Sequence, residues 1–484
     1  MSELVQGFAL VAIVLTVSAL VSGLVERAPL SFPMLFLGLG WLLGAGGLNM
    51  LPIDAHSPIL EAVGIASLAL VLFLDAVKVQ LDELRNDWRI PMLALGPGTL
   101  LIITGVAAAA YLLIGPSPVQ SVVLGAILAS TDPVVLRDVL RNERIPQAVR
   151  RALSFEAGMN DIVVLPIVLI GIAVLTARLG GVLDWMRFLA NLLVLSPLVG
   201  MAVGGVGAWL MGRADRRFGI RREYQALYGI GLVLAAYVAG QAVGGDGFLA
   251  AFFAGLAVTL FNVTLCDCFL EYGEVTAEMA MLLAFVLFGA VFSTLLSTVA
   301  LGPALALALI VIGVMRPLAR WLVLQRAAIS NAARAFIGWF GPRGLNSLLL
   351  ALLVVQAGAP DAEWLLAITG VVVLVSVVAH GASATPLAVW YGRRLAQQTL
   401  AEERESTVVG LFQPDADGVP RITPDELAAR LAGDNPPIVL DVRTRAQYDQ
   451  DRDRIPGSVR VLPDQVEAWA AGQPRERAVV AYCT

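Results

Sequence analysis

The chain has 484 residues, of which 58% are hydrophobic and 15% charged, and its mean hydropathy is +0.79. This balance excludes an ordinary soluble globular protein and places the chain among polytopic membrane proteins. Residues 1–394 hold 23 basic and 23 acidic side chains, whereas residues 395–484 hold 10 basic and 15 acidic ones, which accounts for the net charge of −5. An apolar part is thus joined to a charged, soluble tail.

Thirteen stretches are apolar and long enough to span a hydrocarbon core of about 30 Å. They fall near residues 4–24, 30–48, 57–77, 90–114, 118–140, 152–176, 186–211, 223–243, 247–263, 277–299, 301–324, 333–356 and 363–391. The first has no basic segment before it and no small-residue cleavage site after it, so we expect a retained span. The sequence therefore predicts an all-α membrane protein with about 13 transmembrane helices.

The basic residues between the spans indicate an orientation. Alternate loops, together with the segment after the last span, carry nineteen Arg and Lys residues, whereas the opposite loops carry only Arg178 and Arg187. Cytoplasmic loops are enriched in basic residues. We therefore expect the N-terminus outside and the tail in the cytoplasm, in the inner membrane of a prokaryote.

Two interruptions suggest an internal symmetry. Spans 1–6 and 8–13 read as two six-helix halves of opposite orientation. Thr-Asp-Pro at 131–133 interrupts span five, and Gly-Pro-Arg-Gly at 341–344 interrupts span twelve, the fifth span of the second half. Matched breaks in inverted repeats are typical of crossing, unwound helices around a midplane site. Ordinary proline kinks are the alternative, but each break also carries a charged residue.

The polar residues of span five suit a cation. Pro133 has no N–H and disfavours helix at Asp132, which frees backbone carbonyls, notably that of Thr131. Asp132 would add a carboxylate oxygen.

Span six carries Glu156 and Asn160 on one helix face and Asp161 one step round from it. Asp161 has no basic partner in its own span, which makes it a candidate proton carrier. The alternative is that these carboxylates only form buried ion pairs. Arg343 can neutralise one of them, so at least one would remain uncompensated.

Together, Ser-Thr-Asp-Pro in span five, Glu-x-x-x-Asn-Asp in span six and Pro-Arg-Gly in span twelve resemble the monovalent cation–proton antiporters. The resemblance covers about residues 4–394 and is strongest to the electroneutral branch, which includes bacterial NhaP-type proteins and animal sodium–proton exchangers. It implies that Asp161 exchanges a proton for the cation, with Asp132 and the Thr131 carbonyl beside it. It also implies a homodimer and no cofactor.

The same resemblance assigns three further residues. Asn160 occupies the position of an Asp in the electrogenic relatives, Glu156 would pair with Arg343, and Arg316 would be structural. Ala157 replaces a Ser that helps to bind Na⁺ in sodium-selective members. We expect Na⁺ (or Li⁺) exchange for H⁺, which serves pH and cation homeostasis, with K⁺/H⁺ exchange as the alternative.

The tail suggests a second domain, residues 421–484, after a linker at 395–420. Its Asp-Val-Arg, Ile-Pro-Gly-Ser and Tyr-Cys strings resemble the first half of a rhodanese domain, in which Cys483 would be the sulfur-carrying nucleophile. Because the sequence stops one residue later, we expect an incomplete and inactive domain. A membrane-anchored sulfurtransferase is a distant alternative, since an anchor does not need thirteen spans. Nothing indicates binding of nucleic acid.

Overall fold

The computed structural model describes residues 32–78, 92–133, 145–261, 263–326 and 329–397, and in the tail residues 424–433, 436–443, 453–462, 465–473 and 477–482, with isolated residues between these segments and near the N-terminus. Most of the expected first span, most of the expected linker and Cys483 lie outside the described residues.

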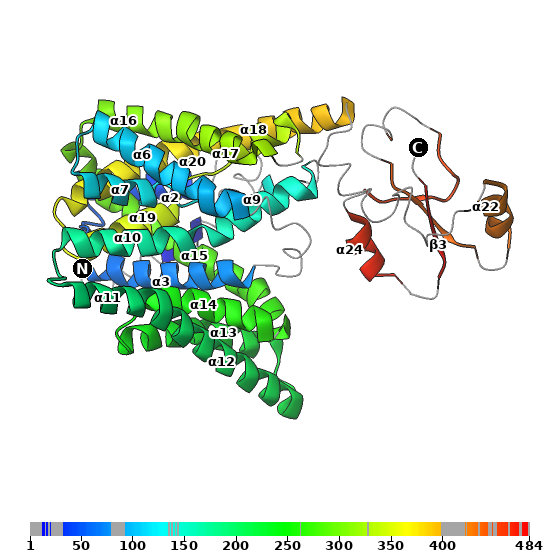
Figure 1. The fold of residues 1–484 in the computed structure, drawn as a ribbon, viewed down its shortest axis with the longest axis horizontal. Helices are drawn as coiled ribbons and strands as arrows, with labels where there is room; N and C mark the ends of the chain where they lie inside the picture. The colour runs from blue at the N-terminus through cyan, green and yellow to red at the C-terminus, as the bar shows by residue number, and fades with distance from the viewer. Residues whose placement is uncertain are drawn as a thin grey trace. The chain divides into compact units, whose positions relative to one another are not determined.

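The membrane part consists of helices (Figure 1). They are α2 (Phe32–Leu43), α3 (Pro58–Val77), α6 (Thr99–Leu113), α7 (Pro118–Ile127), α9 (Gln147–Met159), α10 (Asp161–Leu175), α11 (Val182–Ala190), α12 (Ser196–Phe218), α13 (Arg222–Ala242), α14 (Gly247–Phe261), α15 (Val263–Leu295), α16 (Leu301–Ile310), α17 (Arg316–Val323), α18 (Asn331–Trp339), α19 (Leu345–Gln356) and α20 (Ala362–Gln397). Within the described residues, eight helical stretches are long and apolar enough to cross a membrane, and four shorter apolar helices accompany them. The predicted all-α membrane fold is confirmed.

Both predicted interruptions are real breaks in helical structure. The chain leaves the helix after α7 and runs without regular structure through Ser130–Asp132. It does the same at residues 340–344, between α18 and α19. The spans that precede these breaks share another irregularity, because a π-helical turn occurs at Ala94–Gly98 and another at Val311–Met315. These are the fourth spans of the two halves, which agrees with the inverted repeat.

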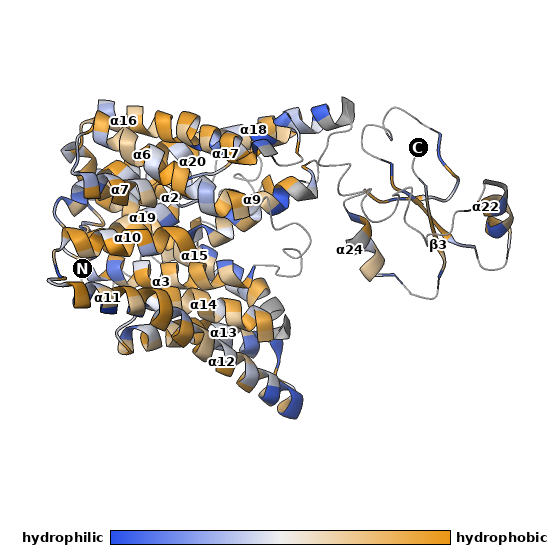
Figure 2. Ribbon diagram, in the orientation of Figure 1, coloured by the Kyte–Doolittle hydropathy of each residue, from blue (hydrophilic) through white to orange (hydrophobic). Residues whose placement is uncertain are grey.

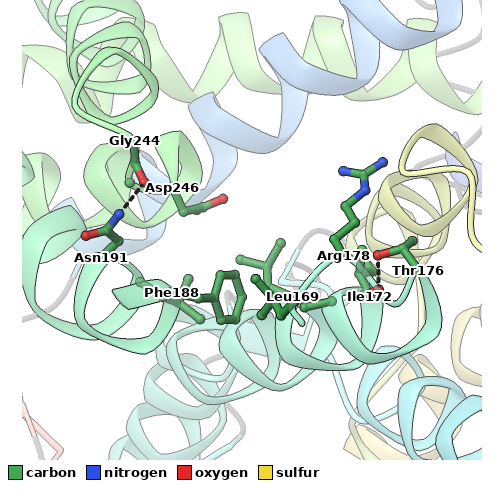
Figure 3. Close-up of a pocket in the computed structure, with 12 residues that line it drawn as sticks. Leu169, Ile172, Thr176, Arg178, Phe188, Asn191, Gly244 and Asp246 are labelled. Atoms are coloured by element: carbon green, nitrogen blue, oxygen red, sulfur yellow. Dashed lines mark hydrogen bonds between the residues drawn. The ribbon is translucent and has the colours of Figure 1, made fainter. Parts of the chain in front are cut away.

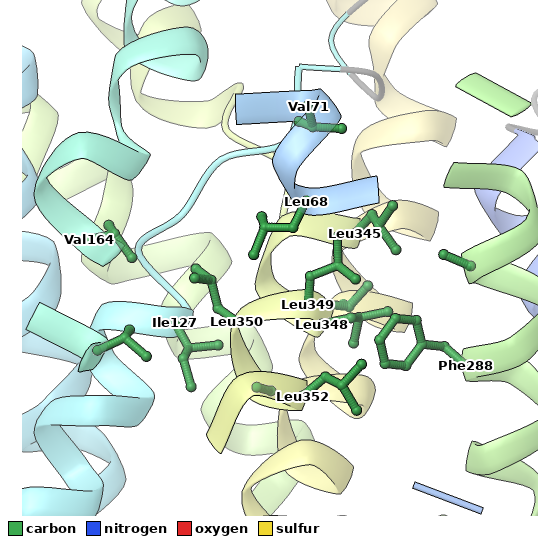
Figure 4. Packing of buried hydrophobic residues seen from close by; sticks show 14 of the residues in the cluster. Leu68, Val71, Ile127, Val164, Phe288, Leu345, Leu348, Leu349, Leu350 and Leu352 are labelled. Atoms are coloured by element: carbon green, nitrogen blue, oxygen red, sulfur yellow. The ribbon is translucent and has the colours of Figure 1, made fainter. Parts of the chain in front are cut away.

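Helix α19 is at the centre of the apolar core. Nearly all of its side chains are buried, which is the pattern of a helix surrounded on every side. Its leucines face Leu68 of α3, Ile127 of α7, Val164 of α10 and Phe288 of α15 (Figure 4). The helix that follows the second break is therefore held by four neighbours, and small shifts at its first residues would be costly.

The surface of the helices agrees with a lipid environment. Hydrophobic residues make up most of their length, whereas hydrophilic residues gather at the end of α12, where Arg213, Arg216 and Arg217 lie (Figure 2). Exposed large apolar residues include Leu198 and Trp209 of this helix. A soluble protein rarely exposes such a surface.

The tail contains a small parallel sheet. Its strand order is β2-β1-β3, with β1 at Ile438–Asp441, β2 at Val459–Arg460 and β3 at Val479–Tyr482. Helices α22 (Pro424–Leu431) and α24 (Val466–Ala471) accompany it. Asp441, at the end of β1, accepts hydrogen bonds from Arg443 Nη2 at 2.6 Å and Tyr482 Oη at 2.8 Å. Burial opposes ionisation, but these bonds outweigh it and lower the pKa of Asp441.

Candidate cation-binding site

The two breaks cross and are bonded to each other. The backbone N–H of Asp132 donates to the carbonyl oxygen of Pro342 at 2.9 Å, and the N–H of Leu345 donates to Asp132 Oδ2 at 2.7 Å. Asp132 thus lies at the N-terminus of α19, where the helix dipole stabilises a negative charge. Gly344 makes this approach possible, since a Cβ at that position would overlap the Asp132 carboxylate.

Asp161 is held by neutral donors. Its side chain is 2% exposed, Oδ1 accepts from Ser130 Oγ at 2.7 Å, and Oδ2 accepts from Asn346 Nδ2 at 2.8 Å. Ser130 belongs to the first break and Asn346 follows the second. Within the described residues, no basic side chain lies within ion-pair distance of Asp161. Among the described residues, the Asp161 carboxylate therefore has neutral hydrogen-bond donors but no ion-pair partner.

The Asn160 side chain donates its hydrogen bonds to residues at the first break and not to Asp161. Its Nδ2 donates to the Ala129 carbonyl at 2.7 Å and lies 3.3 Å from Thr131 Oγ1. The structure thus places Thr131, Asp132, Asn160 and Asp161 around one crossing, all of them buried. These are the four residues that the sequence predicted to lie together.

Glu156 has different partners from the one expected. Its Oε1 lies 2.5 Å from Arg316 Nη1 and 2.7 Å from Arg320 Nη2. Arg316 and Arg320 are four residues apart in α17 and share a helix face. Arg343 instead donates from Nη1 to the Gly341 carbonyl at 2.9 Å and to Thr131 Oγ1 at 3.3 Å. The Glu156–Arg343 ion pair is therefore corrected to a Glu156–Arg316–Arg320 cluster.

This cluster joins the broken helices to their neighbours. Arg316 Nη2 donates to the Phe340 carbonyl at 2.8 Å, at the start of the second break. Arg320 Nη1 donates to the Ala94 carbonyl in the first π-helical turn. Gly341 and Gly98 leave room for the two guanidinium groups, because a Cβ at either position would overlap them.

Asp75 is a further acid of the interior. Its side chain is 1% exposed, and Oδ2 has no hydrogen-bond partner among the described residues. Lys78, three residues further on, interacts electrostatically with Asp75, and its Nζ lies 2.9 Å from Glu274 Oε1. Asp75 interacts electrostatically with Asp161 and Asp132. An Asp near the end of an otherwise apolar span was the available signal.

The second break is also fixed from α20. Ser376 Oγ accepts from the N–H of Arg343 at 2.7 Å and lies 3.2 Å from His380 Nδ1. His380 Nε2 lies 2.9 Å from the carbonyl oxygen of Trp339, the last residue of α18. His380 is thus a packed, hydrogen-bonded residue that holds the two ends of the break.

A cavity lies away from the helix crossing. Its volume is about 290 Å³, and Leu169, Phe188, Asn191 and Asp246 are among its lining residues (Figure 3). None of the acids at the helix crossing lines it.

Comparisons with known proteins agree with this geometry. The model of the family described as "Sodium/hydrogen exchanger, transmembrane" matches residues 12–390, and that of the rhodanese-like domain matches residues 423–484. The chain is 30% identical over 372 residues to the K⁺/H⁺ antiporter NhaP of Alkalimonas amylolytica, covering 74% of this chain and 62% of that protein. It is 29% identical over 396 residues to the K⁺/H⁺ antiporter NhaP2 of Shewanella sp. strain MR-4, covering 79% and 66%. The chain thus spans less than two thirds of the length of these relatives.

The fold has a solved counterpart. The sodium proton antiporter MjNhaP1 of Methanocaldococcus jannaschii, solved at pH 8, superposes with a TM-score of 0.68 at 21% identity, covering 81% of this chain and 99% of that one. Because the family model covers most of the sequence and the helix crossing carries its expected residues, the chain belongs to the sodium/hydrogen exchanger family.

Proposed function

We propose that this chain is a secondary transporter that exchanges a monovalent cation for H⁺ across a membrane. The observation that carries the proposal is the environment of Asp161. Its buried carboxylate lies where two broken helices cross, and its hydrogen-bond donors are neutral. A buried acid in a membrane interior is costly and usually functional. Asp161 can hold either ion, and competition between them couples the two fluxes.

The neighbouring residues have distinct roles in this mechanism. Asp132 is fixed at the N-terminus of α19 and supplies constant negative charge beside the carrier. Thr131 and Asn160 shape the first break. The Glu156–Arg316–Arg320 cluster holds α9, α17 and the second break together. A rigid frame of this kind lets the crossing move as one body between two faces of the membrane.

The buried charges of the membrane part suggest the stoichiometry. Among the described residues of the membrane part, the buried charged side chains that are at most 2% exposed are Asp75, Asp132, Glu156, Asp161, Arg316, Arg320 and Arg343. Four carboxylates against three guanidinium groups leave one negative charge when all are ionised. One proton or one monovalent cation at Asp161 neutralises it, which supports electroneutral exchange.

The cation is the finer part of the proposal. Ala157 offers no hydroxyl to a Na⁺ ion, and the two curated relatives above are both named K⁺/H⁺ antiporters. We therefore favour K⁺ over the Na⁺ that the motif alone suggests. The solved counterpart is named a sodium proton antiporter, so Na⁺ stays as the second candidate.

The same proposal includes the membrane orientation, the oligomeric state and the role of the tail. The distribution of basic residues supports an N-terminus outside and a cytoplasmic tail in a prokaryotic inner membrane. A homodimer is inferred from the family. We propose a docking or regulatory role for the rhodanese-like tail.

The direct test is proton movement in proteoliposomes that contain a pH-sensitive dye. Under an imposed pH gradient, addition of K⁺, Na⁺ or Li⁺ should move protons in the wild-type protein, with K⁺ effective at the lowest concentration. Asp161→Asn is the matched inactive control. Equal signals from the two proteins, or no signal with any cation, would overturn the proposal.

A further inference from the structure

The start of α19 carries an amide in an apolar setting. Asn346 is the second residue of this helix, directly after the second break, and the leucines around it are buried. The side chain of Asn346 is 1% exposed. A buried amide needs a hydrogen-bond partner for both its N–H donor and its oxygen acceptor, because burying either without one lowers the stability of the fold.

Only one side of the Asn346 amide is matched within the described residues. Nδ2 donates to Asp161 Oδ2 at 2.8 Å, whereas Oδ1 is buried and has no hydrogen-bond partner. The orientation of the amide follows from the carboxylate, since an ionised Asp161 accepts from N–H and repels a carbonyl oxygen. Asn346 Oδ1 is consequently without a hydrogen-bond partner among the described residues whenever Asp161 is ionised.

A second amide oxygen is in the same condition. Asn160 uses Nδ2 for the Ala129 carbonyl and Thr131, and its Oδ1 is also buried without a partner. Both amide oxygens without a partner are hydrogen-bond acceptors. Asn346 contacts the Asp161 carboxylate, and Asn160 is the residue before Asp161 in the sequence. Such a set can be satisfied by a cation but not by an anion, and neutral or charged oxygens are the ligands of hard cations.

Asn346 could also supply a cation ligand that residue 157 lacks. Ala157 on α9 has no side-chain oxygen to offer, although its helix leads directly to Asp161. We infer that Asn346 is a cation ligand of the antiport site, with Nδ2 orienting the Asp161 carboxylate and Oδ1 binding the transported monovalent cation. The inference rests on the proposed function and assigns an additional, specificity-determining residue to it.

The test compares Asn346→Ala with Ser347→Ala. Ser347 is the next residue of the same helix and donates from Oγ to the Ile127 carbonyl at 2.9 Å, so its loss removes a buried hydrogen bond without touching Asp161. We expect Asn346→Ala to raise the half-saturating cation concentration about tenfold or more, as for loss of one ligand to a charged group. Ser347→Ala should stay within about twofold of wild type. Asn346→Ser, which keeps an oxygen, should recover part of the loss.

A second readout does not depend on transport. In detergent, K⁺ and Na⁺ should raise the unfolding temperature of the wild type and of Ser347→Ala, because a ligand that binds the folded state stabilises it. The rise should be much smaller for Asn346→Ala. Equal cation stabilisation and equal half-saturation in Asn346→Ala and wild type would overturn the inference and indicate a water at Oδ1. A loss of the same size in Ser347→Ala would also overturn it, as an effect of packing. Absence of exchange in the wild type with cation stabilisation intact would count against the proposed function alone.

Discussion

At the scale of single residues, the carrier site depends on which acids have partners. Glu156 has two guanidinium groups, Asp132 has a helix N-terminus, and Asp161 has only neutral donors. A buried carboxylate is thus paired with cations at one position and held only by neutral donors at another. The difference lies in the neighbours that folding brings, and it decides where a proton or cation can bind.

The first prediction concerns the carrier. Asp161→Asn should abolish cation-driven proton movement, because an amide cannot alternate between two charge states. The amide can still accept from Ser130, so we expect the unfolding temperature in detergent to change by no more than a few degrees. Substantial residual exchange in a well-folded variant would assign the carrier role to Asp132 or Asp75 instead.

The second prediction concerns the arginine cluster. Replacing Glu156 by Ala leaves two buried guanidinium groups unpaired, at a cost of about 3–5 kcal/mol. In a double-mutant cycle, Glu156→Ala combined with Arg316→Ala should recover part of this loss. Glu156→Ala combined with Arg343→Ala should be closer to additive, since Arg343 is bonded to Gly341 and Thr131. Thermal unfolding in detergent measures both cycles, and stronger coupling to Arg343 would restore the pair expected from the sequence.

A third prediction uses a loop residue whose ionisation is disfavoured. Asp246 precedes α14, and its Oδ1 accepts from the N–H of Leu249 at 2.8 Å. Burial raises the pKa of Asp246 to about 6, against the opposing effect of its backbone hydrogen bonds. A raised carboxyl pKa means that folding favours the protonated form, so stability falls as pH rises through the range from about 4 to 6.

Asp246→Asn tests this sign. The amide oxygen can still accept from Leu249, while the charge is removed. The variant should therefore unfold at a temperature several degrees higher than wild type at pH 7–8 and at nearly the same temperature at pH 4. A lower unfolding temperature at pH 8 would show that the ionised carboxylate stabilises the fold.

At the scale of elements, hydropathy and helix breakers predicted most of what the structure contains. Each expected span from the second to the thirteenth coincides with one or two helices, because twenty apolar residues suffice to define a span. The breaks at 131–133 and 341–344 were visible because Pro and Gly disfavour helix. Local sequence carries both signals.

The partners across the crossing could not be predicted in the same way. Arg320 lies near the end of the expected span 301–324, and Glu156 is more than 150 residues away from it in sequence. Asn346 and Ser130 act through contacts between helices that meet only in the fold. The weak signal for Asn346 was a polar residue within an apolar run directly after the second break. Tertiary packing, and not periodicity, selects among such contacts.

The fourth prediction concerns the crossing of the two breaks. Gly344→Ala places a methyl group against the Asp132 carboxylate, which cannot move away without losing its bond to Leu345. We expect transport to be largely lost. Gly231→Ala in α13 is the matched control, because nothing lies within 4 Å of its added Cβ. Normal exchange by Gly344→Ala would mean that Asp132 is not fixed by this contact during transport.

At the scale of the whole molecule, the charge count and the identity of residue 160 point to the same stoichiometry. Within the described residues of the membrane part, four buried carboxylates and three buried guanidinium groups leave one negative charge when all are ionised. Asn160 is neutral, so it adds no second titrating group beside Asp161. Under the proposed exchange, the loaded site would have the same net charge in both halves of the transport cycle.

The last prediction is that the membrane potential does not drive turnover. Moving one elementary charge through 100 mV changes the energy by about 2.3 kcal/mol, so a site that carried net charge would respond strongly. Exchange of Na⁺ or Li⁺ in proteoliposomes should proceed at the same rate with and without a valinomycin–K⁺ diffusion potential. On solid-supported membranes, addition of K⁺, Na⁺ or Li⁺ should give no current that persists at steady state.

Asn160→Asp is the informative companion variant, because a second carboxylate beside Asp161 can carry an additional proton and should introduce such a current. A clear acceleration of the wild type by potential would instead mean that a second acid, with Asp75 and Asp132 as candidates, releases its proton in each cycle.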